Sequence, residues 1–308
     1  MSADDKTGPA GSNSAWPVMV LAHNEERYIA ACLDSIFASD PGCTFEVFVM
    51  ANGCSDRTEQ IVADYAARRP EVRLVSIALG DKCNAWNVFI HETVPAHCPD
   101  RDVYFFMDGD ARAVRGSFSA MARALQDDPH ANAASAIPAS GRDIERDRSA
   151  AFREHGLVAN LYSLRGLFVQ RLREHSVRIP LRLEGDDGLI GALVKWDLMP
   201  ESNGWDPRRI VVCGDAAFEF ESISPIRPQD WGVYWKRAVR YGRRHYEFKL
   251  LGPLFKAKGL TAMPVDITEL YREADKLPVR KQGLYTLTNW VALRQMVNIG
   301  RALEKTRG

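Results

Sequence analysis

The sequence has no long apolar run, no paired cysteines and no excess of charge, and each absence excludes a class of protein. In its 308 residues no apolar stretch approaches the roughly 18 residues that cross a membrane, and no basic-then-apolar segment resembling a signal peptide opens the chain. Forty Lys and Arg balance 40 Asp and Glu, so charge gives no reason to expect nucleic acid as the main partner. The six cysteines are scattered without a Cys-x-x-Cys pair, which indicates a reduced, cytoplasmic compartment and no zinc site.

Three common motifs of nucleotide-binding and hydrolytic enzymes are also missing. No Gly-x-Gly-x-x-Gly follows the first apolar segment, which argues against a dinucleotide dehydrogenase. No Gly-x4-Gly-Lys-Ser/Thr occurs, which argues against a P-loop enzyme, and no Gly-x-Ser-x-Gly supports a hydrolase.

The most informative stretch is the apolar run 103–107, which leads directly into Asp108 and Asp110 on either side of a glycine. Such a run predicts a strand buried on both faces, as in parallel sheets, and ligands bind beyond the carboxyl ends of such strands. Two carboxylates there favour a divalent cation, Mg²⁺ or Mn²⁺, that shares its shell with substrate phosphates and water. A second pair with the same spacing, Asp100 and Asp102, precedes the strand, where solvated surface residues are expected.

Strand and helix patterns alternate four times along the first third of the chain. This alternation is typical of an α/β fold with a doubly wound, mostly parallel sheet. The predicted strands are 17–21, 45–50, 72–77 and 103–107.

Polar side chains follow each predicted strand, and in this architecture they converge on one crevice. Singly, each is also explained as a helix cap, a turn residue or a solvated side chain. The residues are Asn24, Glu25, Asn52, Asp56, Lys82, Asn87, Asp108 and Asp110.

The second half has weaker patterns. We expect an apolar helical tail at 284–303 that either docks on the domain, which the pattern slightly favours, or lies on a membrane surface. The other predicted elements are helices at 116–126, 150–173 and 231–246, strands at 131–138, 209–213 and 216–220, and a mobile loop at 141–148.

Taken together, five segments resemble a family-2 glycosyltransferase with a GT-A fold, from about residue 16 to about residue 246. The resemblance implies a Rossmann-like α/β/α sandwich, here with a helical C-terminal extension. It also implies an inverting, metal-dependent transfer of sugar from a nucleotide donor. The matching segments are 22–26, 52–58, 82–87, 108–110 and 185–190.

The resemblance also assigns roles to single residues. It implies Glu25 near the ribose or base, Asn52 and Asp56 around the base, and Lys82 near the pyrophosphate. It implies Asp110 on the metal and Asp108 on the ribose or metal.

Asp186 and Asp187 precede a predicted helix, where acids cap the helix dipole or, alternatively, one of them takes a proton from the acceptor hydroxyl. The family carries Glu-Asp here with the second acid as base. Asp187 is therefore the predicted base, and Asp186 stands in place of the usual Glu.

Two departures from the family pattern affect the prediction. Processive relatives carry Gln-x-x-Arg-Trp where this chain has Lys236, Arg240 and Tyr241, which indicates transfer of one or a few sugars. Arg240 and its basic neighbours either reach the diphosphate or an anionic acceptor, or form a solvated face. A histidine that often supplies a third metal ligand is missing, and Glu219 or Glu221 is the candidate substitute.

We expect a disordered tail at 1–15, a glycosyltransferase domain at 16–250 and a helical extension at 251–308. The nucleotide-sugar half of the domain is expected at 16–115 and the acceptor half at 116–250. A UDP-sugar is the default donor, and the acceptor is a saccharide, a lipid-linked molecule or another hydroxyl compound. Two alternatives stay open: a binding or scaffold protein with weak catalysis, and a sugar nucleotidyltransferase. The expected location is the cytoplasm, including the inner membrane face.

Overall fold

The computed structural model describes residues 15–221 and 231–307, so the tail predicted at 1–15 lies almost wholly outside the described residues. Its centre is an eight-stranded sheet with the order β3-β2-β1-β4-β7-β6-β8-β5. The first four strands pair in parallel, and β7 then runs antiparallel to both β4 and β6. The strands are β1 (Trp16–Ala22), β2 (Phe45–Asn52), β3 (Val72–Ile77), β4 (Val103–Asp108), β5 (Ala111–Ala113), β6 (Ala133–Pro138), β7 (Leu161–Arg165) and β8 (Ile210–Phe220).

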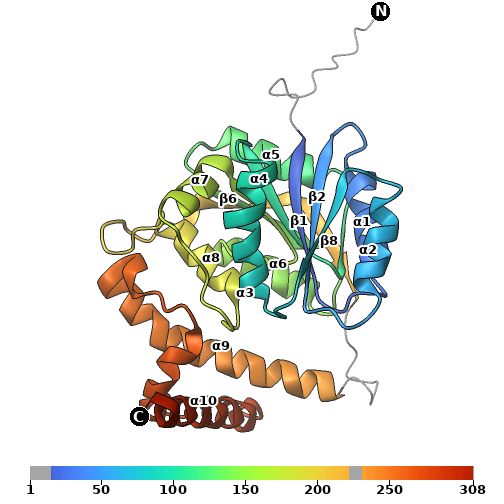
Figure 1. The fold of residues 1–308 in the computed structure, drawn as a ribbon. Helices are drawn as coiled ribbons and strands as arrows, with labels where there is room; N and C mark the ends of the chain where they lie inside the picture. Colours follow the sequence, from blue (N-terminus) through green and yellow to red (C-terminus); the bar gives the residue numbers. More distant parts are fainter. Residues whose placement is uncertain (1–14, 222–230, 308) are drawn as a thin grey trace, which may run out of the picture.

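Helices cover both faces of the sheet, and two long helices, α9 and α10, lie below it in Figure 1. The helices of the sheet layers are α1 (Ile29–Ser39), α2 (Thr58–Ala66), α3 (Lys82–Val88), α4 (Val94–His97), α5 (Ser117–Asp127), α6 (Ile144–Glu154), α7 (Gly166–Glu174) and α8 (Asp186–Lys195). A π-helical turn, η1 (Phe89–Thr93), joins α3 to α4, and a 3₁₀ turn, η2 (Pro207–Arg209), precedes β8. The C-terminal part comprises α9 (Trp231–Lys258), η4 (Gly259–Ala262), η5 (Ile267–Lys276) and α10 (Tyr285–Arg307).

The sheet separates two apolar cores. Successive side chains of a strand point to opposite faces, so Phe105 packs with α1 and α5 while Phe106 packs with α3 and α7. Both are fully or almost fully buried. Strands with two buried faces read as continuous apolar runs, which is why the first four strands were predictable. The doubly wound α/β fold with a mostly parallel sheet and a C-terminal helical extension is therefore confirmed.

The helix predicted at 150–173 is wrong. Helix α6 ends where His155 adopts a left-handed φ of 46°, and residues 161–165 form β7 between β4 and β6. Leu161 and Leu164 have helical spacing, yet they lie in the two different cores because this strand is buried on both faces. Because every residue of the strand is buried or nearly so, its apolar residues include a set with the spacing of an apolar helix face.

Two smaller predictions also need correction. The mobile loop predicted at 141–148 is largely helix, since α6 begins at Ile144. The two strands predicted at 209–213 and 216–220 are one strand, β8, whose pairing with β6 shifts register between Ser135 and Ile137. An irregular stretch inside a continuous strand looks like a break in the sequence pattern.

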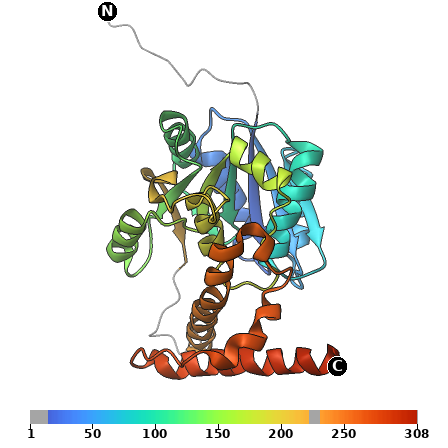
Figure 2. The ribbon, with the colours of Figure 1, turned by 90° about the vertical axis from the view of Figure 1, so that its left-hand side faces the viewer.

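The apolar tail docks within the protein. Helix α10 packs against α9 and η5, and Ala292 and Met296 on it are fully buried (Figure 2). Other apolar side chains of α10 face outward, including Leu287 and Trp290. Among the described residues, no helix combines the length and apolarity needed to cross a membrane.

Candidate active site

Asp108 and Asp110 lie at the carboxyl end of β4, beside the end of β1. The backbone N–H of Gly109 donates to the carbonyl of Leu21 at 2.8 Å. A Cβ on Gly109 would lie 2.9 Å from that same oxygen, so only glycine permits this approach. The glycine thus fixes both carboxylates next to the β1–α1 loop.

Lys82 connects this strand end to α8. It is the first residue of α3, whose N-cap Asp81 accepts from the backbone N–H of Asn84. Its ammonium lies 3.1 Å from Asp108 and 3.5 Å from Asp186. Burial lowers the pKa of Lys82, but the nearby carboxylates outweigh this and hold the pKa well above its ordinary value. Lys82 is therefore a fixed cation between two acids.

One lysine does not neutralise the acids around it. Burial and the carboxylates of Asp110 and Asp108 raise the pKa of Glu25 to about 7. Burial also raises the pKa of Asp108 to about 6, although the Lys82 ammonium opposes the shift. A further cation would favour the ionised forms of both side chains.

The carboxylates at this strand end fit a metal ion that takes only some of its ligands from the protein. Within residues 15–221 and 231–307, no three His, Cys, Asp or Glu side chains converge closely enough to enclose a cation. Mg²⁺ and Mn²⁺ suit oxygen ligands, and Mg²⁺ commonly takes one or two carboxylates with substrate phosphates and water. Asp108 and Asp110 could supply the protein's share.

Glu219 and Glu221 each have another partner, and a third metal ligand from either of them stays a prediction. Glu219 pairs with Arg112 at 3.6 Å, and Glu221 accepts from the hydroxyl of Tyr28 at 2.6 Å. Neither joins Asp108 and Asp110 in a three-ligand cluster among the described residues.

Helix α8 begins at Asp186, and its first residues contact α9. Gly185 precedes it with a φ of 93°, and a Cβ there would lie 2.5 Å from Nε of Arg244 on α9. Arg244 pairs with Asp187 at 3.2 Å, while Asp186 faces Lys82. Burial raises the pKa of Asp187, although the Arg244 guanidinium opposes the shift. The two adjacent acids thus face two different cations.

A buried glutamate supports this helix start. Glu247 on α9 is fully buried and accepts from the backbone N–H of Glu184 at 2.8 Å and from the hydroxyl of Tyr271. Glu184 also pairs with Arg243 at 3.5 Å. Helix α9 therefore fixes the segment that leads into Asp186 and Asp187.

Four predicted donor-binding residues are engaged within the protein. Oδ1 of Asn24 accepts from the backbone N–H of Ser55 at 2.8 Å, and Asn52 donates to the carbonyl of Ala22 at 2.8 Å. The others are Asp56, which accepts from the backbone N–H groups of Glu26 and Thr58, and Asn87, which makes two bonds with the backbone of Ile179. These contacts brace the loops, and direct contact of the four with a donor stays a prediction.

Arg240 is exposed on α9, close enough to Glu184 to lower its pKa, although burial raises that pKa overall. The sequence identified Arg243 and Arg244 only as basic neighbours of Arg240, and Glu247 was not predicted as a site residue. Residues three and four apart share a helix face, so the spacing 240, 243, 244 and 247 was the available signal. It could not show that this face meets α8.

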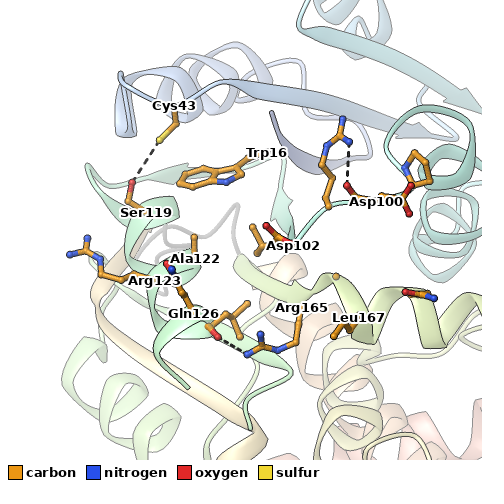
Figure 3. Close-up of a pocket in the computed structure, with 16 residues that line it drawn as sticks. Trp16, Cys43, Asp100, Asp102, Ser119, Ala122, Arg123, Gln126, Arg165 and Leu167 are labelled. Atoms are coloured by element: carbon orange, nitrogen blue, oxygen red, sulfur yellow. Dashed lines mark hydrogen bonds between the residues drawn. The ribbon is translucent and has the colours of Figure 1, made fainter. Parts of the chain in front are cut away.

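Two pockets lie at opposite ends of strand β4. A small one beneath Lys82, Asp108 and Asp186 is lined by the buried rings of Trp86 and Tyr162. A larger one, of about 920 Å³, lies at the opposite edge of the sheet, around the starts of β1 and β4 (Figure 3). It contains Asp100 and Asp102, the second pair with the Asp-x-Asp spacing.

Solved structures of similar fold are GT-A glycosyltransferases. The mannosyltransferase PcManGT from Pyrobaculum calidifontis, in complex with GDP-Man and Mn²⁺, has a TM-score of 0.55 and 17% sequence identity, covering 92% of this chain and 85% of that one. TarS from S. aureus, in complex with UDP, has a TM-score of 0.50 and 18% identity, covering 95% and 92%. These likenesses define the fold as GT-A.

The sequence itself gives the family. The profile described as Glycosyl transferase family 2 matches residues 18–179, just over half of the chain. The chain therefore belongs to glycosyl transferase family 2 and is a glycosyltransferase. No curated protein matches it in sequence.

Proposed function

We propose that the protein moves a single sugar from a nucleoside diphosphate donor to an acceptor hydroxyl, with inversion and with a divalent metal. The observation that carries the proposal is the Lys82 ammonium between Asp108 and Asp186, with Asp187 adjacent. One cation faces both the strand end expected to hold the diphosphate and the helix expected to hold the base. The complexes of PcManGT with GDP-Man and Mn²⁺ and of TarS with UDP support this choice of donor class.

Different residues take the proton, stabilise the leaving group and hold the metal. A carboxylate oxygen of Asp187 takes the acceptor's hydroxyl proton as the hydroxyl oxygen bonds to the anomeric carbon. The bond from that carbon to the diphosphate oxygen breaks, and the nucleoside diphosphate leaves with its electron pair. Lys82 stabilises the negative charge that develops on the leaving group. A metal at Asp108 and Asp110, when bound, supplies further charge stabilisation of the same kind.

Residues 16–250 form the proposed catalytic domain, with the nucleotide-sugar half at 16–115 and the acceptor half at 116–250. Lys236, Arg240 and Tyr241 in place of Gln-x-x-Arg-Trp support non-processive transfer. We also keep a UDP-sugar as the default donor and the cytoplasm, including the inner membrane face, as the location. Exposed Leu287 and Trp290 on α10 are the apolar groups that such a membrane contact would use.

A thermal-shift panel of nucleoside diphosphates, with and without Mn²⁺, tests the donor site, because ligands that bind the native state raise its melting temperature. We expect a metal-dependent shift with one nucleotide that disappears in Asp110→Ala. Transfer of labelled sugar to acceptor extracts then tests the reaction. Full transfer by both Asp110→Ala and Asp187→Ala would disprove the assigned roles.

One observation favours a second function, nucleotide-sugar binding without turnover. The proposed base, Asp187, pairs with the Arg244 guanidinium at 3.2 Å, and this contact opposes the rise in its pKa that burial produces. Metal-dependent nucleotide binding without transfer to any acceptor would support this alternative. Release of pyrophosphate would instead indicate a sugar nucleotidyltransferase.

A further inference from the structure

A second group of cations, on α9 and on the segment that precedes α10, lies next to the proposed base. Arg244, Lys249 and Arg280 line an open pocket of about 470 Å³, together with Tyr241, His245 and Phe248. No carboxylate is among these lining residues. The whole chain carries equal numbers of acidic and basic residues, so this local excess of positive charge does not follow from overall composition.

Arg244 belongs to both the pocket and the active site. It lines the pocket, and its guanidinium pairs with Asp187 at 3.2 Å. Asp187 balances the charge of Arg244, which leaves the two charges of Lys249 and Arg280. Burial lowers the pKa of His245, and the cations of Arg280 and Lys249 beside it lower it further.

The cationic and aromatic side chains that line the pocket indicate the kind of ligand it binds. Two guanidinium groups and one ammonium favour phosphate, since arginine presents paired N–H donors that match its oxygens. Within residues 15–221 and 231–307 neither Lys249 nor Arg280 pairs with a carboxylate, and their two positive charges match a phosphomonoester dianion. The exposed ring of Tyr241 and the half-buried ring of Phe248 add apolar surface beside the charged end.

We propose that this pocket binds the phosphate group of the acceptor, so that the acceptor is a phosphomonoester whose hydroxyl reaches Asp187. The assignment rests on the proposed function, because it names the acceptor class for the same site. The phosphate itself undergoes no bond change. It positions the molecule, and the hydroxyl loses its proton to Asp187 as described above.

The test measures binding of glycerol 3-phosphate to the full chain by calorimetry, with UDP and Mg²⁺ saturating so that the donor site is filled. We expect binding by the natural sequence and roughly tenfold weaker binding by the double variant Lys249→Gln, Arg280→Gln, because each removes one charged contact at an exposed site. The matched control Lys256→Gln, Arg301→Gln removes two exposed cations outside the pocket and should bind normally. Equal melting temperatures would show that both variants fold.

Vesicles distinguish a soluble acceptor from a lipid. Sedimentation with vesicles of phosphatidic acid in phosphatidylcholine, but no binding of glycerol 3-phosphate, would assign the phosphate to a lipid headgroup, provided the double variant loses it. Equal affinity of all variants for both probes, or no binding of either probe, overturns the proposal. If phosphate binds but UDP with Mg²⁺ gives no thermal shift, the proposed function and the acceptor assignment fail, whereas the anion site stands.

Discussion

Strand β4 carries an Asp-x-Asp pair at each end, and the two pairs differ in everything except spacing. Asp108 ends the strand and pairs with the Lys82 ammonium at 3.1 Å, and both Asp108 and Asp110 lie close enough to Glu25 to raise its pKa. Asp102 precedes the strand and is exposed, and its carbonyl accepts from the backbone N–H of Gly166. Position at the carboxyl edge, where loops from several strands meet, gives the first pair its chemical environment.

The largest expected effect compares these two ends directly. Asp110→Ala should lower kcat/KM for sugar transfer by about a hundredfold to a thousandfold, because it removes charge stabilisation of the leaving diphosphate. Asp102→Ala, at the amino edge, should leave the rate within about twofold, as surface changes commonly do. Steady-state kinetics with one donor and one acceptor would check both. Equal losses in the two variants would contradict the assignment of the carboxyl edge as the site.

The next effect concerns Lys82, which lies at the carboxyl edge of the sheet. Lys82→Met should weaken UDP binding about tenfold and lower kcat roughly a hundredfold, because the fixed cation facing the leaving group is lost. Lys256→Met, which changes an exposed lysine of α9, is the matched control. Calorimetry with UDP and Mg²⁺ separates the two effects. Normal UDP affinity in Lys82→Met would show that the ammonium does not contact the nucleotide.

A third prediction tests the support that α9 gives to the carboxyl edge through Glu247. Glu247→Ala should lower the free energy of unfolding by about 2–3 kcal/mol, because it leaves the buried Tyr271 hydroxyl and the Glu184 N–H without their acceptor. Glu273→Ala on η5, whose carboxylate makes a surface pair with Lys276, should leave it almost unchanged. Urea unfolding would measure both.

Glu247 also has a positioning role that stability alone does not capture. Glu247→Gln keeps an oxygen to accept from Glu184 and should recover most of kcat, whereas Glu247→Ala should reduce kcat at temperatures where it is still folded. Equal kcat in the two variants would limit Glu247 to stability.

The sequence predicted those strands and carboxylates that can be recognised from the residues immediately around them. Apolar runs ending in polar residues identified the first four strands. Because the carboxyl ends of parallel strands meet at one edge of the sheet, Asp108 and Lys82 were expected to lie close together. The second half was harder because β7 is buried on both faces, and Leu161 and Leu164 then gave the spacing of a helix. Continuous burial removes the alternation that distinguishes a strand.

Long-range packing was the other limit. Arg244 and Glu247 are ordinary residues of an amphipathic helix until α9 is placed against the start of α8. Asn24 and Asn87 show the converse, since strand-end position favoured ligand contact while the structure engages them with loop backbone. Position along a strand indicates where a polar group lies, and only packing shows what it contacts.

The smallest expected effect is the pH dependence of stability without ligands. The pKa of Glu25 is raised to about 7 and that of Asp108 to about 6, so the native state holds more protons than the unfolded chain between about pH 4 and pH 7. These groups therefore make the free energy of unfolding fall as pH rises through that window. Asp108→Asn should flatten the fall, while Lys256→Gln, which removes no carboxyl group, should keep it. Melting temperatures from pH 4.5 to 7.5 would check this, and an unchanged slope in Asp108→Asn would mean that Asp108 ionises in the folded protein without penalty.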